Sequence, residues 1–243
     1  MGLNMAITEL ESDKALCKKK KMMLAKVYVD DISKWGSMVE VDRVVDVSKA
    51  SKKLGRAKVD ELLKKNRIEE PEDGKVFLEK IKDDSEKKLL MPFVEDVKTN
   101  WILMEKVPGA KKNEVLAAAN KQNSVTEWDL VEFDDMYATC AKCGLSWDNK
   151  KGCVGNFGPS TSPVPDLAKK YGLTMLSKVN EYGEEKKVLT SKDAQQLLSE
   201  VKVLREKVPA EGKMMVRRIE GTLNRLEALA KCSKEYEVDF YFF

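Results

Sequence analysis

Hydrophobic and polar positions in the first third of the chain follow the spacings of strands and short helices. Leu24–Ile32 alternates apolar and polar side chains, which predicts a strand. Val39–Val47 is rich in Val, and its charged residues leave strand and helix both open. In Val47–Ile68, two apolar stripes separated by Gly55 predict a helix–turn–helix pair. A PEDG turn and a strand over Lys75–Ile81 complete the order expected of a winged helix.

The middle of the chain has the pattern of a β–α–β unit. Trp101–Val107 and Val125–Phe133 alternate as strands, and Lys111–Lys121 between them is predicted to be helical. Such a unit is half of a ferredoxin-like sandwich. The segment WILMEKVPGAKKNEVLAAA, residues 101–119, resembles part of the ligand-binding half of Lrp-type regulators. The resemblance is confined to these residues, and no function is taken from it.

The C-terminal part combines a loop, a helical hairpin and an aromatic tail. Thr139–Pro165 is rich in Cys, Gly and Pro and is predicted to be a loop. Ser191–Val208, with Ser191 as N-cap, and Ala210–Cys232 carry apolar stripes that predict the two helices of a hairpin. Tyr236–Phe243 is strand-like and aromatic. Because such a strand would aggregate if exposed, we expect it to pair at a sheet edge or to dock on a partner.

Together these elements predict an α+β protein of two parts. Residues 1–95 form a winged-helix-like region in this interpretation. Residues 96–243 form a ferredoxin-like unit with an inserted Cys/Gly-rich metal loop, the helical hairpin and the C-terminal strand. A length of 243 residues allows either one large domain or two small ones.

Composition narrows the chemistry, mainly because the chain contains no His. A Ser–His or Cys–His catalytic pair cannot be built from it. A mixed Cys/His zinc finger and a His-ligated haem are excluded for the same reason. The chain has no nucleotide-binding fingerprint, so an enzyme is not the expected class. The composition does not exclude a catalytic metal that is held by three thiolates and keeps one coordination position open.

Charge and hydropathy indicate a cytoplasmic protein without membrane insertion. Lys and Arg total 44 against 41 Asp and Glu, so the net charge of +3 creates no global field for nucleic acid. No apolar stretch approaches the ~18 residues needed to cross a bilayer. Acidic residues precede the basic run Lys18–Lys21, which is the reverse of a secretory signal. The chain is rich in Lys and Glu and has only three Gln, a composition that is typical of archaeal and thermophile proteins.

The most distinctive motif is a cluster of cysteines, C-x2-C-x9-C. Cys140 and Cys143 form a knuckle in which two thiolates can face one ion, and Cys153 adds a third sulfur. Gly144, directly after the knuckle, is expected to adopt a positive φ. Three nearby lysines are expected to favour the thiolate form: Lys142, Lys150 and Lys151. In a large intracellular protein this pattern indicates metal or redox chemistry.

A four-coordinate site needs one more ligand, and three side chains are candidates: Cys17, Cys232 and Asp148. An all-cysteine zinc site would recruit one of the two distant cysteines. A [4Fe–4S] cluster could use three or four cysteines. The third interpretation is a set of metal-free, buried or redox-sensing thiols.

A second candidate surface is the basic helix pair, defined here as Val47–Arg67. It contains eight basic residues against Asp60 and Glu61. Such a patch suits contacts to phosphate, although the second helix has few side chains that read base edges. Lysine-rich helix faces are also commonly solvated surface. The candidate nucleic-acid contacts are Lys49, Lys52, Lys53, Arg56 and Lys58.

The sequence thus favours a cytoplasmic accessory or regulatory protein that binds a larger protein partner. Its cysteine loop would hold zinc or an iron–sulfur cluster, or sense redox state. The aromatic tail and the helical hairpin are the expected contact surfaces. The alternative is a metal-containing winged-helix regulator that binds DNA through the basic helix pair. The sequence does not determine an oligomeric state.

Overall fold

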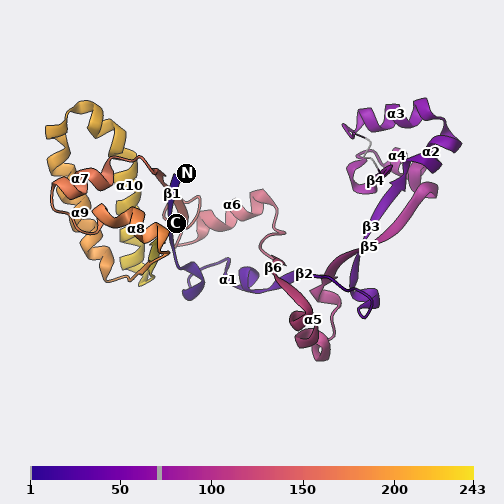
Figure 1. Ribbon diagram of the computed structural model, residues 1–243, viewed down its shortest axis with the longest axis horizontal. Helices are drawn as coiled ribbons and strands as arrows, with labels where there is room; N and C mark the ends of the chain where they lie inside the picture. The colour runs from indigo at the N-terminus through magenta and orange to yellow at the C-terminus, as the bar shows by residue number, and fades with distance from the viewer. Residues whose placement is uncertain (1, 70–72) are drawn as a thin grey trace. The chain divides into compact units, whose positions relative to one another are not determined.

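The computed structural model describes residues 2–69 and 73–243 and has an α+β architecture with two sheets (Figure 1). The chain divides into two compact units. One unit combines Met1–Met23 with Thr126–Phe243, and the other is Leu24–Val125, inserted between these two segments. The division predicted between residues 95 and 96 falls inside strand β5 (Val94–Leu103), so the two units do not follow it.

The unit that contains both chain ends has a four-stranded sheet. Its strands lie in the order β7 (Val154–Pro159), β1 (Gly2–Ile7), β9 (Phe240–Phe242) and β8 (Val188–Leu189). β1 runs antiparallel to both β7 and β9, and β9 runs antiparallel to β8. The aromatic tail therefore does form a strand, but β9 lies between two neighbours and not at an edge. Sequence patterning did not predict β1.

Helices of this unit complete the fold around the sheet. They are α1 (Lys18–Met22), α6 (Phe133–Lys142), α7 (Val164–Lys170), α8 (Val179–Glu184), α9 (Asp193–Lys207) and α10 (Lys213–Tyr236). The predicted hairpin is confirmed as α9 and α10. Ser191 is not its N-cap, because α9 begins at Asp193 and Lys192 occupies the cap position. The Asp193 carboxylate instead accepts the N–H of Thr190 at 2.8 Å.

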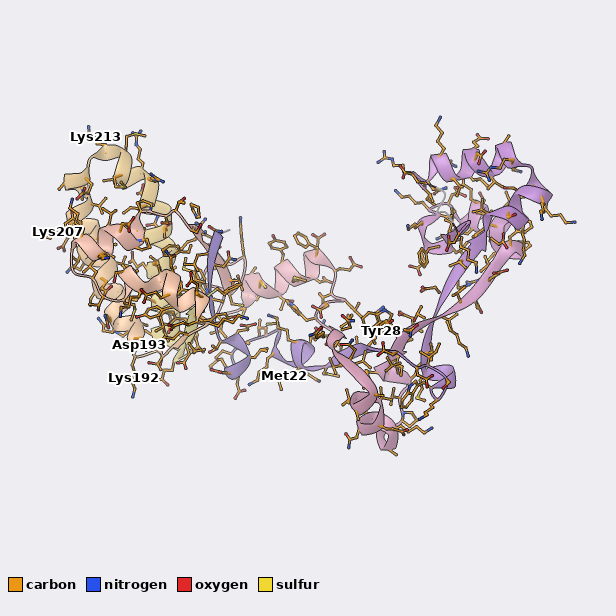
Figure 2. The ribbon with its side chains drawn as sticks, viewed as in Figure 1. Met22, Tyr28, Lys192, Asp193, Lys207 and Lys213 are labelled. Atoms are coloured by element: carbon orange, nitrogen blue, oxygen red, sulfur yellow. The ribbon has the colours of Figure 1, made fainter. Side chains whose placement is uncertain are left out.

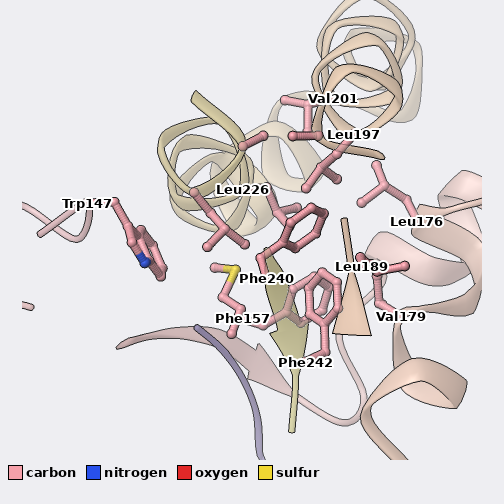
Figure 3. Close-up of a cluster of buried hydrophobic side chains, with 14 of the residues drawn as sticks. Trp147, Phe157, Leu176, Val179, Leu189, Leu197, Val201, Leu226, Phe240 and Phe242 are labelled. Atoms are coloured by element: carbon pink, nitrogen blue, oxygen red, sulfur yellow. The ribbon is translucent and has the colours of Figure 1, made fainter. Parts of the chain in front are cut away.

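The aromatic tail is part of the core of this unit (Figure 3). Phe240 and Phe242 are fully buried among side chains that include Leu197 of α9 and Leu226 of α10. Phe242 also packs edge-on against Phe157 of β7, with ring centroids 6.0 Å apart. Burial of these two rings makes them part of the core, whereas Phe243 at the end of the tail is 43% exposed. The use of the tail as a contact surface stays a prediction.

The inserted unit contains a five-stranded sheet in the order β4 (Lys75–Phe77), β3 (Val39–Asp46), β5, β2 (Leu24–Val29) and β6 (Ala119–Thr126). Its helices are α2 (Val47–Leu54), α3 (Arg56–Lys65), α4 (Asp84–Leu90) and α5 (Lys112–Ala118). β2 and the helix pair agree with their sequence patterns, and the Val-rich segment, for which strand and helix were both open, forms β3. The strand predicted over Lys75–Ile81 is shorter, since β4 ends at Phe77. Part of the predicted PEDG turn lies outside the described residues. The α+β class is confirmed, whereas the winged-helix and ferredoxin-like units stay predictions.

The predicted strand over Val125–Phe133 is wrong. β6 ends at Thr126, and α6 begins at Phe133. Between them, the Asp129 carboxylate accepts hydrogen bonds from both the N–H and the hydroxyl of Thr126, at 2.8 and 2.7 Å. These side-chain bonds stabilise a turn and compete with an extended strand. The alternation of apolar residues in this segment therefore does not indicate a strand.

Candidate cysteine site

The cysteine site is built from three segments of the unit that contains both chain ends. Cys17 is the residue before α1. Cys140 lies in the last turn of α6, and Cys143 is the residue after that helix. Cys153 directly precedes β7. Thr139–Pro165 is thus not one continuous loop, since a helix end and a strand flank its central turn.

A tight turn returns the chain from the knuckle to Cys153. Asn149 and Lys150 both have positive φ, 50° and 59°, and the N–H of Lys151 donates to the carbonyl of Asp148 at 2.8 Å. Two successive residues with positive φ are the mark of a type I′ turn, which reverses the chain within two residues. The indole N–H of Trp147 then donates to the carbonyl of Cys153 at 2.8 Å. These bonds position the third cysteine of the motif.

Gly144 has a different role from the one its sequence position suggested. It is not among the residues with positive φ. A Cβ at this position would lie 2.8 Å from the hydroxyl oxygen of Tyr236 at the end of α10. A side chain at this position would therefore force the Tyr236 ring to move away from the backbone.

The N-terminal segment lies against this loop. The N–H of Ile7 donates to the carbonyl of Cys153 at 3.3 Å, which continues the pairing of β1 with β7. Farther along, the thiol of Cys143 lies 3.8 Å from the carbonyl oxygen of Lys14. The N–H of Glu127 donates to the carbonyl of Met23 at 2.8 Å, where the inserted unit begins and ends. These contacts bring Cys17 to the loop.

Four of the five cysteines line one small cavity: Cys17, Cys140, Cys143 and Cys153. The cavity has a volume of about 20 Å³, and Glu9 is also part of its wall. That volume is about the space that one water molecule occupies. In the described ranges, no three Cys, Asp or Glu side chains are already arranged as a metal coordination shell. The cavity therefore collects the sulfur atoms without placing them at ligand geometry.

Burial controls protonation of these thiols. It raises the pKa of Cys153 to about 12, and it also raises the pKa of Cys17 and of Cys140. The Lys21 ammonium offsets part of this rise for all three thiols. The expectation that neighbouring lysines make the cysteines thiolates is therefore wrong for these three. Without a metal, they are protonated at neutral pH.

Glu9 and Lys21 belong to the site, and sequence reasoning missed both. The Lys21 ammonium forms an ion pair with the Glu9 carboxylate at 2.6 Å. Burial alone would lower the pKa of Lys21, but the hydrogen bond to Glu9 raises it above its ordinary value. A signal for Lys21 was present, because it follows Cys17 by four residues and so lies on the same side of a helix. No spacing or motif around Glu9 in the sequence indicated that it would lie beside the cysteines.

The other two candidates for the fourth ligand do not line the cavity. Cys232, on α10, is buried in the core, and burial raises the pKa of its thiol to about 12. The Asp148 carboxylate lies 3.6 Å from the Nε of Arg225 and accepts a bond from the Asn149 side chain. Cys17 is the fourth-ligand candidate that the structure brings to the motif.

The basic helix pair lies in the inserted unit, and part of its charge is neutralised. Lys49 forms ion pairs with Asp46 and Glu95, and Arg56 pairs with Asp60 at 2.8 Å. The other three candidate contacts are exposed, and within the described part of the chain they form no ion pairs: Lys52, Lys53 and Lys58.

Comparisons with known proteins give no match to a family model, a curated protein or a solved structure. Among the helices of residues 2–69 and 73–243, none is long and apolar enough to cross a bilayer.

Proposed function

We propose that this protein is an accessory or regulatory protein that binds a larger protein partner, and that one zinc ion at Cys17, Cys140, Cys143 and Cys153 stabilises it. One observation carries the proposal: three separate segments contribute four thiols to a single cavity. All five cysteines are free, as expected in the reducing cytoplasm, where we place the protein.

The size of the cavity and its donors support a single ion. Zinc takes four thiolates at about 2.3 Å in a tetrahedron, so small side-chain rotations around a cavity of about 20 Å³ can complete the shell. An iron–sulfur cube contains eight core atoms and needs more room, which makes it the second choice. Ligation releases thiol protons and leaves a dianionic centre, and the nearby Lys21 ammonium favours that charge.

A closed four-sulfur site is structural and not catalytic. Zinc bound here would tie the Met1–Met23 segment to the loop after α6, next to the point where the inserted unit leaves and returns. The role of the zinc would therefore be to hold these two segments in one arrangement, so that the surface they form keeps a constant shape. The absence of His and of an open coordination position supports a protein that binds others without catalysing a reaction.

Metal analysis of anaerobically purified protein tests the site. We expect about one zinc per chain and no visible absorption band. Cys17→Ser and Cys143→Ser should lose the zinc, whereas the matched Cys232→Ser variant should keep it. A broad visible band would identify iron and reject zinc. A metal-free protein whose four thiols react with a thiol reagent would reject both metals.

Limited proteolysis tests the structural role. Chelation, or the Cys17→Ser change, should speed tryptic cleavage within Lys18–Lys21, because the segment loses its attachment. Cleavage in the Lys-rich inserted unit should stay unchanged and is the internal control. Equal cleavage of loaded and chelated protein would contradict a structural role.

α6 supports the interaction part of the proposal. None of its residues is buried, and Phe133 and Tyr137 are 66% and 43% exposed. Their rings pack together with centroids 4.5 Å apart, one helical turn before the knuckle. Exposed aromatic pairs of this kind mark protein contacts more often than single exposed residues do.

Quantitative affinity capture from native cells tests this surface. Changing Phe133 and Tyr137 together to Ser should reduce recovery of a partner while the zinc content stays constant. The control is Met214→Ser, which removes an apolar side chain of α10 that is even more exposed, at 77%. Equal recovery by all three proteins would contradict a contact through α6.

The finer fold assignments belong to this proposal. The order α2, α3, β4 supports a winged-helix-like region. The order β5, α5, β6 supports a ferredoxin-like unit, in which the two strands flank β2 in the sheet.

DNA binding by the basic helix pair is a second candidate, because Lys52, Lys53 and Lys58 are exposed. Changing these three to Gln should weaken duplex binding and flatten its salt dependence. Unchanged affinity would eliminate the candidate.

A further inference from the structure

One face of the sheet in the inserted unit is covered by its own core, and the other face carries aromatic side chains. Val27 and Val29 of β2 are buried in a cluster with Ile102 of β5. Because successive strand residues point to opposite faces, Lys26 and Tyr28 lie on the other side. Figure 2 labels Tyr28 on β2. No residue of this face belongs to the candidate sites that the sequence suggested.

This face contains a groove of about 460 Å³, within the range of ligand-binding cavities. Tyr28 and Trp101 are register partners on β2 and β5, and their rings meet edge-to-face with centroids 5.6 Å apart. Phe77 of β4, on the edge strand, is 41% exposed and also lines the groove. Three aromatic rings therefore surround one open space.

The charged side chains of the groove are mostly acidic. Glu40, Asp42 and Glu79 face one ammonium, that of Lys26. Lys26 lies 2.9 Å from the Glu40 carboxylate and 5.2 Å from the centroid of the Trp101 ring. Within the described residues, Asp42 and Glu79 have no ion-pair partner. The groove thus already holds the Lys26 ammonium between a carboxylate and an aromatic face, and the Lys80 ammonium lies 5.6 Å from the centroid of the Phe77 ring. The Asp42 and Glu79 carboxylates stay available for another cation.

We infer that this groove binds a basic segment of a partner protein, with a Lys or Arg side chain held between the aromatic rings and the Asp42 and Glu79 carboxylates. Cation–π attraction and opposite charge act on the same ligand group here, and each is strengthened as water is excluded. Single-stranded nucleic acid also stacks on aromatic sheet faces, but it requires a positive groove. The excess of carboxylates favours the basic peptide.

The inference does not depend on the cysteine site. Its test is calorimetric titration of the full-length protein with a blocked peptide of alternating Lys and Gly. A Glu–Gly peptide and oligothymidylate serve as comparison ligands. We expect the Lys–Gly peptide to bind, and the Asp42→Asn/Glu79→Gln double variant to bind it about tenfold more weakly. The matched control, Glu61→Gln on α3, removes an exposed carboxylate outside the groove and should bind as the wild type does.

The aromatic half of the site has its own variant. Trp101→Leu keeps an apolar side chain in the sheet but removes the ring face, and it should also weaken binding about tenfold. Circular dichroism shows whether the Trp101→Leu variant still folds. If it does not fold, the Asp42→Asn/Glu79→Gln variant alone tests the inference. Three results would overturn the inference: no binding of the Lys–Gly peptide, tighter binding of oligothymidylate, or an equal loss in Glu61→Gln.

Discussion

The unit formed by Met1–Met23 and Thr126–Phe243 surrounds one continuous core, whereas the Leu24–Val125 unit divides its buried side chains between two smaller clusters. In the first unit, strands from both chain ends, β1 and β9, pair at the centre of the sheet. In the second, each cluster is formed by neighbouring strands and short helices. Since burial of apolar surface is the main stabilising term, we expect the inserted unit to unfold first.

Fluorescence can follow the two units separately. Trp128 and Trp147 belong to the core of the first unit, and Trp35 and Trp101 belong to the second. Removing either pair by Trp→Phe substitution leaves reporters on one unit only. A single urea transition common to both reporters would contradict the independence of the two cores.

The largest expected effect is on the continuous core. Phe240→Ala removes a fully buried ring and should lower the free energy of unfolding of the first unit by about 4 kcal/mol. Urea denaturation followed through Trp128 and Trp147 measures this. The control is Phe243→Ala in the same tail, where the side chain is 43% exposed and the loss should be well below half as large.

Ile81→Ala makes the corresponding change in the inserted unit. Ile81 is fully buried in one of the small clusters, and its truncation should cost about 3 kcal/mol, less than for Phe240 because fewer atoms are lost. The Trp35 and Trp101 reporters should shift while those of the first unit do not. Val97→Ala, on an exposed part of β5, should cause little change. A shift of both units would show that their stabilities are coupled.

A buried carboxylate provides the next smaller effect. Glu200 of α9 accepts the N–H groups of Met175 and Leu176 at 3.0 and 2.8 Å, and the amide of Gln196 at 2.8 Å. Glu200→Ala leaves buried donors without acceptors and should destabilise the first unit by about 2 kcal/mol. Glu206→Ala, exposed on the same helix, should be neutral in the same denaturation assay. Equal effects would contradict this role of the carboxylate.

The smallest expected effect is on the stability of the inserted unit at acidic pH. Hydrogen bonds from Lys65 and Asn66 hold the pKa of Glu86 below its ordinary value in the folded inserted unit. Its stabilising contribution is therefore complete above the unfolded pKa, near 4.5, and is lost as pH falls through the lower folded pKa. Glu86→Gln should flatten the decline in stability of this unit below about pH 5. An unchanged pH dependence would contradict the assignment.

Local sequence patterns were sufficient where an element is stabilised by its own amphipathic face. The α9–α10 hairpin, the α2–α3 pair and strand β2 all follow their apolar spacing, whereas the pattern over β3 left strand and helix both open. The patterns failed between Val125 and Phe133, where the Asp129 side chain bonds back to Thr126 and forms a turn. They also failed for β1, a strand that pairs with β7 and β9 and buries four of its six residues. Such pairing is invisible in a short window of sequence.

The sequence by itself determined the α+β class, the absence of histidine chemistry and three of the four thiols that line the cavity. Only the tertiary structure decided that Cys17 joins them, that Glu9 and Lys21 lie beside them, and that the aromatic tail is core. The physical reason is the insertion of Leu24–Val125, which separates Met23 from Glu127 along the chain although their backbones are hydrogen-bonded. The spacing of residues in the sequence predicts which side chains are neighbours within one segment. This cavity is enclosed by segments that meet only after the chain has folded.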